Sequence, residues 1–420
     1  MAEMKDSGTA WLGMIPKDWE LSKISSIYEL RTQKVNDKDY PPLSVTMNGI
    51  VPQLDSAAKT NAHDDRKLVK KGDFAINSRS DRRGSCGVSE YDGSVSLINT
   101  VMKPRDEMNP DYYNWLFHTI QFADEFYKWG HGIVDDLWTT NWQDMKHIDI
   151  PVPTLDEQKV IADYLNKAIP EIDALHTDIE KQIETLEEYK KSIITEAVTK
   201  GLDPDVEMKD SGIELIGQIP NEWKISRLGW ISKKIGDGIH GTVTFEDGET
   251  NFYFINGNNI KKRNITIKDN TQRITARIYN TYKTNLTTHT ILISLNGTIG
   301  NLAFYNNENV LLGKSVGFIE LKEEYNKEYI YYLLQANYIK TIFELSFAGT
   351  TINNLSLQTL RKTNVLLPPK TEQKKIVKYL DKKCAEIDGA IEEKKEQLDT
   401  LEQYKKSVIY EYVTGKKEVQ

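Results

Sequence analysis

The chain is written twice, and this internal repeat limits the folds that it can adopt. An opening block, Met4-Lys-Asp-Ser-Gly8 with Ile15-Pro16 and Trp19, recurs 204 residues later as Met208-Lys-Asp-Ser-Gly212 with Ile219-Pro220 and Trp223. A closing block, Glu157-Gln158, Glu171-Ile172-Asp173 and Tyr189-Lys-Lys-Ser192, recurs 215 residues later, from Glu372 to Ser407. Such a period is far too long for a solenoid, whose repeats are about 20–50 residues long. The repeat therefore predicts tandem domains, each followed by a helix.

The closing blocks have the spacing of long, paired helices. Their apolar positions alternate in steps of three and four, which is the heptad pattern. The predicted seam consists of Ile161, Leu165, Ala168, Ile172, Leu175, Ile179, Gln182, Leu186, Tyr189 and Ile193, and of Ile376, Leu380, Lys383, Ile387, Ala390, Lys394, Gln397, Leu401, Tyr404 and Val408. We expect the helices to pair antiparallel with Gln182 and Gln397 matched. We also expect a kink or break at Pro170, and a helix end at Gly201 before Pro204.

Between the repeated blocks the two halves diverge and have the composition of mixed domains. Residues 229–320 contain short β-rich runs with Asn-Gly and Gly turns, while 110–127 and 325–345 have helical patterns. We therefore expect an α+β fold, in which two α/β domains in tandem are joined and separated by two long antiparallel coiled-coil helices with a pseudo-twofold repeat. The predicted segments are an opener (1–24), an insert (25–150), a helix (151–203), a linker with the second opener (204–228), the second insert (229–365) and the second helix (366–420).

The net charge of −8 counts against a nucleic acid partner, but the charge is unevenly distributed. The first insert has 15 basic and 19 acidic residues, whereas the second has 15 basic and 11 acidic residues. No apolar run approaches the ~18 residues of a membrane span, and no secretory signal is recognisable, so we expect a cytoplasmic protein without a membrane partner. The two cysteines and seven histidines have no metal-ligand spacing, so we expect no structural zinc.

Three motifs resemble functional signatures, and each has a simpler structural interpretation. Gly236-Asp-Gly-Ile-His-Gly241 satisfies GxGxxG but precedes a strand-like run, so we interpret it as a Gly-rich turn. Asn109-Pro-Asp-Tyr112 resembles the Asn-Pro-Pro-Tyr of adenine methyltransferases without its second proline, so we expect an ordinary helix start. Trp11, Trp19 and Trp223 are expected to pack in a core rather than to stack on bases. No catalytic constellation remains, so we expect no enzyme activity, cofactor or metal in this chain.

Polar and basic loop residues of the inserts are the candidates for a nucleic acid interface. Guanidinium groups suit guanine edges and phosphates, and asparagine amides suit adenine edges. The candidates are Lys34, Asn48, Asn77, Arg79, Arg82, Arg83 and His131, with Lys59 as a further cation, and His240, Asn258, Lys261, Lys262, Arg263, Asn296 and Lys314. Solvated loops are the alternative for all of them.

The repeated helix segments Tyr189-Lys190-Lys191 and Tyr404-Lys405-Lys406 are candidates for partner binding. Two identical exposed patches related by pseudo-symmetry are what two copies of one partner would dock on. A solvated helix face is the alternative.

The order, duplication and spacing of these motifs resemble the specificity subunit of type I restriction-modification systems. The resemblance is carried by the Gly-x-Ile-Pro-x-x-Trp openers, the helix entries after Pro153 and Pro369, the Tyr-Lys-Lys-Ser helix ends and the strand and turn that end at Gly300. It implies a non-catalytic subunit with two target-recognition domains, each reading one half of a split, asymmetric site in double-stranded DNA. It also implies that the helices dock two modification subunits, which bind AdoMet and methylate adenine. Two restriction subunits, with ATP and Mg, would complete the complex.

The first insert departs from this expectation, because its excess of four acidic residues is a weak footprint for DNA binding. Either the positive face is local to Arg79–Arg83, or the modification subunits supply most of the phosphate contacts. A coiled-coil adaptor with two protein-binding inserts is the alternative that the acidity favours.

Overall fold

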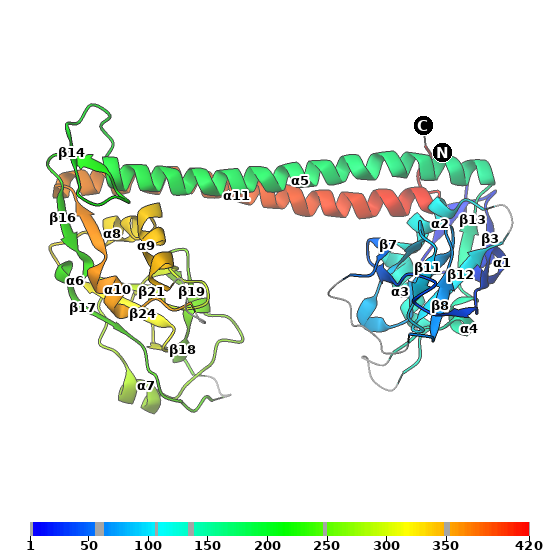
Figure 1. The fold of residues 1–420 in the computed structure, drawn as a ribbon, viewed down its shortest axis with the longest axis horizontal. Helices are drawn as coiled ribbons and strands as arrows, with labels where there is room; N and C mark the ends of the chain where they lie inside the picture. Colours follow the sequence, from blue (N-terminus) through cyan, green and yellow to red (C-terminus); the bar gives the residue numbers. More distant parts are fainter. Residues whose placement is uncertain are drawn as a thin grey trace. The chain divides into compact units, whose positions relative to one another are not determined.

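The computed structural model describes residues 3–54, 63–105, 108–132, 138–246, 250–347 and 353–419, and it divides into two compact units. Unit 1 consists of Met1–Glu180 with Lys395–Gln420, and unit 2 consists of Lys181–Lys394. The boundary passes through the two longest helices, α5 (Leu155–Lys200) and α11 (Lys370–Val413). Each unit therefore contains one α/β domain and a segment of both long helices (Figure 1).

Along the chain, the first domain extends from the N-terminal segment to the start of α5. Its strands are β1 (Met4–Asp6), β2 (Met14–Pro16), β3 (Glu20–Lys23), β4 (Tyr28–Leu30), β5 (Lys34–Val35), β6 (Leu43–Thr46), β7 (Gly49–Pro52), β8 (Arg66–Val69), β9 (Phe74–Asn77), β10 (Cys86–Val88), β11 (Gly93–Val95), β12 (Asn99–Pro104) and β13 (Asp149–Val152). Its helices are α1 (Ile24–Ile27), the 3-10 helix η1 (Ser80–Arg82), α2 (Pro110–Phe117), α3 (Ile120–Lys128) and α4 (Trp142–Met145).

Along the chain, the second domain follows α5 and precedes α11. Its strands are β14 (Met208–Asp210), β15 (Gln218–Pro220), β16 (Lys224–Arg227), β17 (Ser232–Asp237), β18 (Tyr253–Ile255), β19 (Ile260–Lys261), β20 (Asn264–Ile265), β21 (Thr290–Ser294), β22 (Leu302–Phe304), β23 (Val310–Leu312), β24 (Val316–Leu321) and β25 (Asn364–Leu367). Its helices are α6 (Leu228–Ile231), the 3-10 helix η3 (Gly257–Asn259), α7 (Ala276–Tyr282), α8 (Lys327–Leu333), α9 (Asn337–Phe347) and α10 (Leu357–Lys362).

Both domains contain an antiparallel four-stranded sheet of the same topology. The strand order is β10-β9-β12-β4 in the first domain and β22-β21-β24-β17 in the second. In each domain two helices follow the sheet, α2 and α3 or α8 and α9, and a final strand pairs with the strand after the opener, β13 with β3 or β25 with β16. The two inserts therefore share one fold, although the sequence shows only local similarity between them.

The domains differ in the elements added to this common sheet. The first domain adds the three-stranded sheet β11-β8-β5 and the hairpin β6–β7. The second adds the parallel pair β18–β23, the hairpin β19–β20 and helix α7. The hairpin β6–β7 lies next to the loop after β9, since residues of both line one groove.

The tryptophans of the openers are buried in the two cores, as predicted. Trp11 and Trp19 are 5% and 4% exposed, and Trp223 is 1% exposed. The Nε1 of Trp19 donates to Oε1 of Glu157 at 3.0 Å, and the Nε1 of Trp223 donates to Oε2 of Glu372 at 3.0 Å. In each unit an opener tryptophan therefore ties the start of a long helix to its domain.

Within each unit α5 and α11 lie side by side and antiparallel (Figure 1). In unit 1 the Nζ of Lys405 donates to Oδ1 of Asp173 at 2.5 Å, and in unit 2 the Nζ of Lys190 donates to Oδ2 of Asp388 at 2.6 Å. The repeated Ile-Asp motif of one helix thus meets the repeated Tyr-Lys-Lys motif of the other. The predicted α+β fold with two domains and paired long helices is confirmed.

In the central part of the helices, every second position of the predicted seam is buried or half-buried. At the positions between, the residue in the seam is the one next to the predicted residue. Ile179 and Ile193 are buried as predicted, but Leu175, Gln182, Tyr189, Gln397 and Tyr404 are exposed. Ile183 and Leu398 are half-buried and replace the two glutamines. A heptad can alternate four and three in either order. The apolar residues at 183, 391 and 398 fit the order of steps opposite to the predicted one. The prediction that Gln182 and Gln397 occupy matched seam positions is therefore wrong.

The two predicted features of the α5 backbone have different outcomes. The helix continues through Pro170, so the predicted break is wrong. A proline inside a helix removes one hydrogen bond, and the burial of the neighbouring Ile169 in the core of unit 1 offsets that loss. The helix ends at Lys200, and Gly201 has a φ of +82°, which confirms the predicted glycine end.

Candidate functional site

A groove on the first domain brings together four of the predicted residues. It lies between the hairpin β6–β7 and the segment after β9 that contains η1, and its volume is about 570 Å³. The predicted residues that line it are Asn77, Arg79, Arg82 and Arg83. Met47, whose side chain is 68% exposed, also lines it from the hairpin turn. The groove therefore combines guanidinium, amide and apolar groups, which are the groups that contact base edges.

The three arginines of the groove differ in how far other residues of the chain neutralise them. Arg79 forms an ion pair with Asp81 at 3.1 Å. Arg83 pairs with Asp124, and its guanidinium lies over the ring of Tyr127. Arg82 lies 3.8 Å from Asp81 and its side chain is 68% exposed. Among the three, Arg82 is therefore the guanidinium most accessible to a ligand.

Two paired asparagines line the groove, and only one of them was predicted. Asn77 and Asn99 are opposite each other on β9 and β12. The Oδ1 of Asn77 accepts a hydrogen bond from the backbone N of Arg79 at 3.1 Å, so it holds the arginine loop. Asn99 is 5% exposed, and its Oδ1 has no hydrogen-bond partner among the described residues. The pairing of β9 with β12 was the signal that could have identified Asn99.

The other predicted residues of the first domain do not line this groove. Lys34 in β5 pairs with Asp65 at 2.6 Å. His131 pairs with Asp144 through its Nε2 at 3.0 Å. Asn48 is exposed in the turn of the hairpin β6–β7, next to Met47. Lys59 lies outside the described residues.

The second domain has an equivalent loop with different side chains. Residues 295–301 follow β21 as residues 78–85 follow β9. An isolated bridge holds each loop, since Arg79 pairs with Thr139 and Asn296 pairs with Asn354. Asn296 therefore occupies the position of Arg79. The loop Leu295-Asn-Gly-Thr-Ile-Gly-Asn301 has no lysine or arginine, so one scaffold presents a cationic loop in the first domain and a neutral loop in the second.

Most of the other predicted residues of the second domain are exposed on turns and strand ends. These residues are His240, Asn258, Lys261 and Lys314. His240 pairs with Asp237 at 2.7 Å. The backbone N of Gly257 donates to Oγ of Ser315 at 3.0 Å, so the turns that contain Asn258 and Lys314 lie next to each other.

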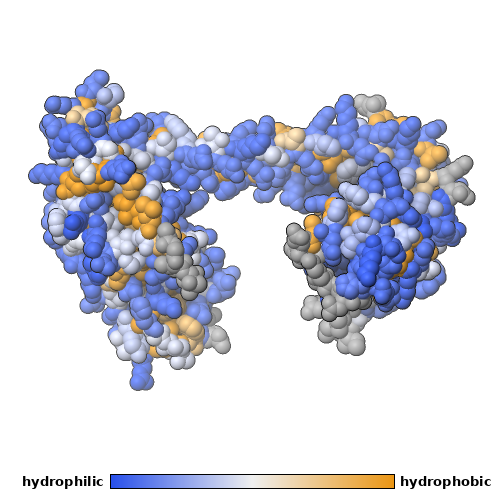
Figure 2. Space-filling model, in the orientation of Figure 1, coloured by the Kyte–Doolittle hydropathy of each residue, from blue (hydrophilic) through white to orange (hydrophobic). Residues whose placement is uncertain are grey.

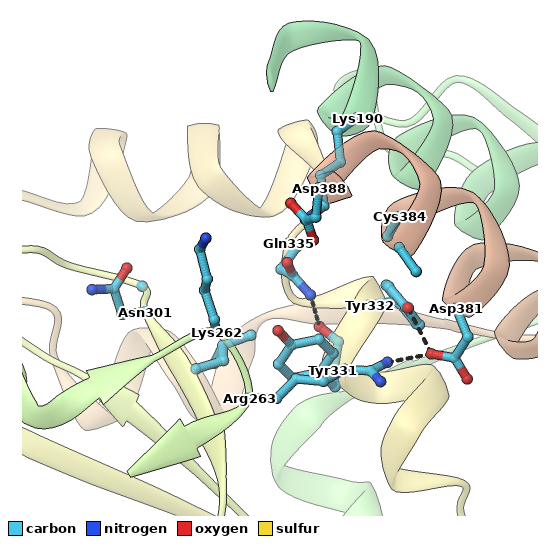
Figure 3. A pocket seen from close by; sticks show the side chains of 13 residues that line it. Lys190, Lys262, Arg263, Asn301, Tyr331, Tyr332, Gln335, Asp381, Cys384 and Asp388 are labelled. Atoms are coloured by element: carbon cyan, nitrogen blue, oxygen red, sulfur yellow. Dashed lines mark hydrogen bonds and ion pairs between the residues drawn. The ribbon is translucent and has the colours of Figure 1, made fainter. Parts of the chain in front are cut away.

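Arg263 and Lys262 line a cavity of about 330 Å³ inside unit 2 (Figure 3). The Nη2 of Arg263 donates to Oδ1 of Asp381 in α11 at 2.6 Å, and the guanidinium lies 4.9 Å from the ring centroids of Tyr331 and Tyr332. Burial disfavours the charged form of Arg263, but the hydrogen bond that Arg263 donates to Asp381, together with the electrostatic effects of Asp381, Tyr331 and Tyr332, outweighs burial and raises the pKa of Arg263. Arg263 is thus engaged within the unit, and its role in DNA binding stays a prediction. Lys262 is exposed.

The predicted partner-binding segments divide into residues that face the other long helix and residues that face outward. Lys190 and Lys405 form the ion pairs with Asp388 and Asp173, so they hold the helices together. Their role in partner binding stays a prediction.

The outward residues of these segments are the repeated tyrosines and the lysines Lys191 and Lys406. Tyr189 and Tyr404 are 52% and 51% exposed. Lys406 pairs with Glu402 of its own helix at 2.5 Å, and Lys191 is exposed. Figure 2 shows a mainly hydrophilic face on the long helices of each unit, interrupted by small hydrophobic patches. The same tyrosine is therefore presented to solvent in both repeats.

The motifs that resemble cofactor signatures have structural roles. Gly236 lies within β17, where an added Cβ would meet the ring of Phe318, so the predicted turn begins only after this strand. Asn109 caps α2 by accepting a hydrogen bond from the backbone N of Tyr112, which confirms the ordinary helix start. The described residues contain no group of three His, Cys, Asp or Glu side chains placed to hold a metal ion. In the described part of the chain no helix has the length and hydropathy needed to cross a membrane.

Comparison with known proteins gives one consistent family. The family described as "Type I restriction modification DNA specificity domain" matches residues 16–185 and 220–403. The type I restriction enzyme MjaVIII specificity subunit of Methanocaldococcus jannaschii is 25% identical to this chain, over 96% of this chain and 93% of that protein.

Two solved structures have the same fold over almost the whole length. A chain in the structure described as "Structural basis underlying complex assembly and conformational transition of the type I R-M system" has a TM-score of 0.70 and 15% identity, and covers 96% of this chain and 99% of its own length. The HsdS subunit from Thermoanaerobacter tengcongensis has a TM-score of 0.50 and 16% identity, and covers 96% and 98%. The duplicated openers, domains and helices, together with the two matched regions, show that this chain belongs to the type I restriction-modification DNA specificity family.

Proposed function

We propose that this specificity subunit is the DNA-reading part of a type I restriction-modification complex, and that each domain reads one half of a bipartite, asymmetric site. The observation that carries the proposal is the pair of loops after β9 and β21, which have the same place in the sheet and different side chains. Base contacts specify sequence, whereas phosphate contacts position the protein. One scaffold with two unlike loops is therefore suited to two unlike half-sites.

The acidity of the first domain is compatible with this role because several of its arginines lie together in one place. Arg79, Arg82 and Arg83 all line one groove. A local cluster attracts phosphate even where the net charge of a domain is negative. We assign the remaining phosphate contacts to the modification subunits, so the isolated chain should bind DNA feebly and the assembled complex tightly.

We also propose that the long helices scaffold two modification subunits and that two restriction subunits complete the complex. Support comes from Tyr189 and Tyr404, which are exposed to the same extent at equivalent positions of the repeat. Two equivalent patches suit two copies of one partner. In this proposal the chain itself is not catalytic. AdoMet belongs to the modification subunits, and ATP and Mg belong to the restriction subunits.

The test is to express the chain with its modification subunit and to map methyladenine on a DNA library of random sequence. The proposal predicts a split motif with a methylated adenine in both halves. It also predicts that Arg82→Glu abolishes or alters the recognised motif, whereas an adaptor that binds only proteins would leave methylation unchanged. The pure chain with AdoMet and DNA is the control, and sustained methyl transfer by it would contradict a non-catalytic role.

A further inference from the structure

Arg263 belongs to a turn whose backbone conformation is costly. The strands β19 and β20 are joined by the two residues Lys262 and Arg263, with φ of 42° and 72°. Both angles lie in the left-handed region, which residues other than glycine rarely adopt because the Cβ comes too close to the following carbonyl oxygen. Asn-Gly is the usual sequence for such a turn. Strain of this kind persists only where surrounding contacts hold it, and it is a reason to look for a function.

The side chain of Arg263 supplies the contacts that tie the turn to α8 and α11 (Figure 3). Its Nη2 donates to Oδ1 of Asp381 at 2.6 Å, and the same oxygen accepts a hydrogen bond from the hydroxyl of Tyr332 at 2.7 Å. The guanidinium also lies 4.9 Å from the ring centroids of Tyr331 and Tyr332 and 5.8 Å from that of Phe304. A guanidinium that is both stacked and paired cannot be replaced by a lysine without loss.

The backbone of Arg263 connects the side-chain contacts with Asp381, Tyr331 and Tyr332 to the loop 295–301. Its N donates to the carbonyl of Leu302 at 3.2 Å, and its carbonyl accepts from the N of Phe304 at 2.8 Å. Leu302 and Phe304 are the ends of β22, and β22 follows directly after the loop 295–301. Contacts therefore run without interruption from Asp381 in α11, through Arg263, to the strand that carries this loop.

Unit 1 makes a joint at the equivalent place without an arginine, and there the Nδ2 of Asn166 also donates to Oδ2 of Asp111 in α2 at 3.2 Å. Asn166 and Trp115 are the repeat equivalents of Asp381 and Tyr332, and the Nε1 of Trp115 donates to Oδ1 of Asn166 at 2.9 Å. Both units thus join the first helix after the sheet to a long helix. The joint of unit 2 adds the ion pair between Arg263 and Asp381 and, through Arg263, a bridge to β22 next to the loop 295–301.

We propose that Arg263 is a positioning residue for the second half-site: by bridging Asp381 to β22, it fixes the orientation of the loop 295–301 on the long helices. This inference rests on the proposed function. It predicts that loss of the Arg263 side chain reduces discrimination in the half-site read by the second domain and leaves discrimination in the other half-site intact.

The experiment uses the complex of this chain with its modification subunits and the motif mapped as described above. Initial methylation rates are compared on the cognate site, on a site with one base pair changed in the first half and on a site with one changed in the second half. The wild-type complex must discriminate in both halves, and if it does not, the proposed function fails before this inference is tested. We expect Arg263→Ala to reduce second-half discrimination about tenfold or more and first-half discrimination less than twofold.

Arg263→Gly separates the side chain from the backbone of the turn. Glycine adopts a φ of 72° without strain, so a purely structural role in the turn predicts that Arg263→Gly behaves as wild type. The positioning role predicts the same selective loss as in Arg263→Ala. Asp381→Asn removes the ion pair while keeping the shape of the side chain, and we expect it to cause the same selective loss to a smaller degree.

The matched control is Lys327→Met. Lys327 also lies 4.9 Å from the ring centroid of Phe304, but its Nζ donates to the carbonyl of Thr288 and not to α11. We expect this variant to discriminate as wild type does in both halves. Arg263→Gly that keeps second-half discrimination within twofold of wild type, or that loses discrimination equally in both halves, would overturn the proposal.

Discussion

Arg82 is the single residue from which we expect the largest effect on DNA recognition. Its guanidinium is the most accessible of the three in the groove of the first domain. A guanidinium that contacts a base edge contributes about 1–3 kcal/mol of discrimination. We therefore expect Arg82→Ala to relax the methylated motif at one position of the first half-site by roughly 10-fold or more, as measured by sequencing methylated DNA.

The control for Arg82 is Lys71→Ala in the same domain. Lys71 is 70% exposed, pairs with Glu90 at 3.0 Å and does not line the groove. The Lys71→Ala variant should leave the methylated motif unchanged. If Arg82→Ala weakened methylation equally on all sequences, Arg82 would be a phosphate contact and not a base contact.

Glu157 and Glu372 accept equivalent tryptophan hydrogen bonds, yet their ionisation should affect stability in opposite directions. Burial acts to raise the pKa of Glu157, but hydrogen bonds from Thr154 and Trp19 outweigh it and lower the pKa below its ordinary value. Burial is the main cause that raises the pKa of Glu372. The fold therefore favours the ionised form of Glu157 and the protonated form of Glu372.

The linkage between pKa and stability gives the sign of each effect. The contribution of Glu157 is present above the unfolded pKa and is lost as pH falls through its lowered folded pKa. The contribution of Glu372 is present at low pH and is lost as pH rises through its raised folded pKa. At pH 7 we expect Glu157→Gln to lower the unfolding temperature and Glu372→Gln to leave it unchanged or raise it. Calorimetry at pH 7 and pH 4 checks this, and equal shifts for both variants would contradict it.

At the scale of elements, the order of the seam positions in the long helices is open to a direct test. Leu398 is half-buried and Gln397 is exposed. We expect Leu398→Ala to lower the free energy of unfolding by about 1–2 kcal/mol, because it removes apolar contacts. Gln397→Ala should change it by less than about 0.5 kcal/mol. Chemical denaturation of the two variants measures the difference, and a larger effect at Gln397 would restore the predicted seam.

The elements that the sequence predicted well are those with local or repeated signals. The long helices, the Gly201 helix end and the packing of Trp223 follow from periodicity, capping and duplication. The common topology of the two sheets could not be predicted, because the strands share few side chains. The role of Arg263 was missed for a related reason, since its partner Asp381 is 118 residues away and a Lys-Lys-Arg run looks like a solvated loop.

The candidate site was predictable only where its residues are close together in the sequence. The cluster Arg79–Arg83 is contiguous in the sequence, so its placement in one groove follows from one loop. Asn99 enters the groove only through strand pairing with Asn77. The heptad pattern predicted the helices correctly, but not the order in which steps of three and four alternate along the seam. Leu175 fits one order and Ile183 fits the other, so the apolar residues alone did not decide between them.

At the scale of the whole molecule, the repeat predicts two equivalent docking sites for modification subunits. We expect Tyr189→Ala or Tyr404→Ala alone to yield complexes with one modification subunit instead of two, and the double variant to yield the free chain. Native mass spectrometry of the purified complexes counts the subunits. Leu175→Ala is the control, since this residue is also exposed on a long helix, at 51%, but lies outside the repeated segments. Full assembly of the double variant would show that the tyrosines are not docking residues.

In our proposal, one chain with two unlike loops on one scaffold defines a split DNA site. The most direct measurement is the map of methyladenine in the genome of the source organism, by modification-sensitive long-read sequencing, with the gene intact, deleted, and restored with residues 78–85 exchanged for those of another specificity subunit. We expect a split motif that disappears on deletion and that returns, after the exchange, with only its first half changed. A methylation map that is the same in all three strains, or a change in both halves after the exchange, would contradict it.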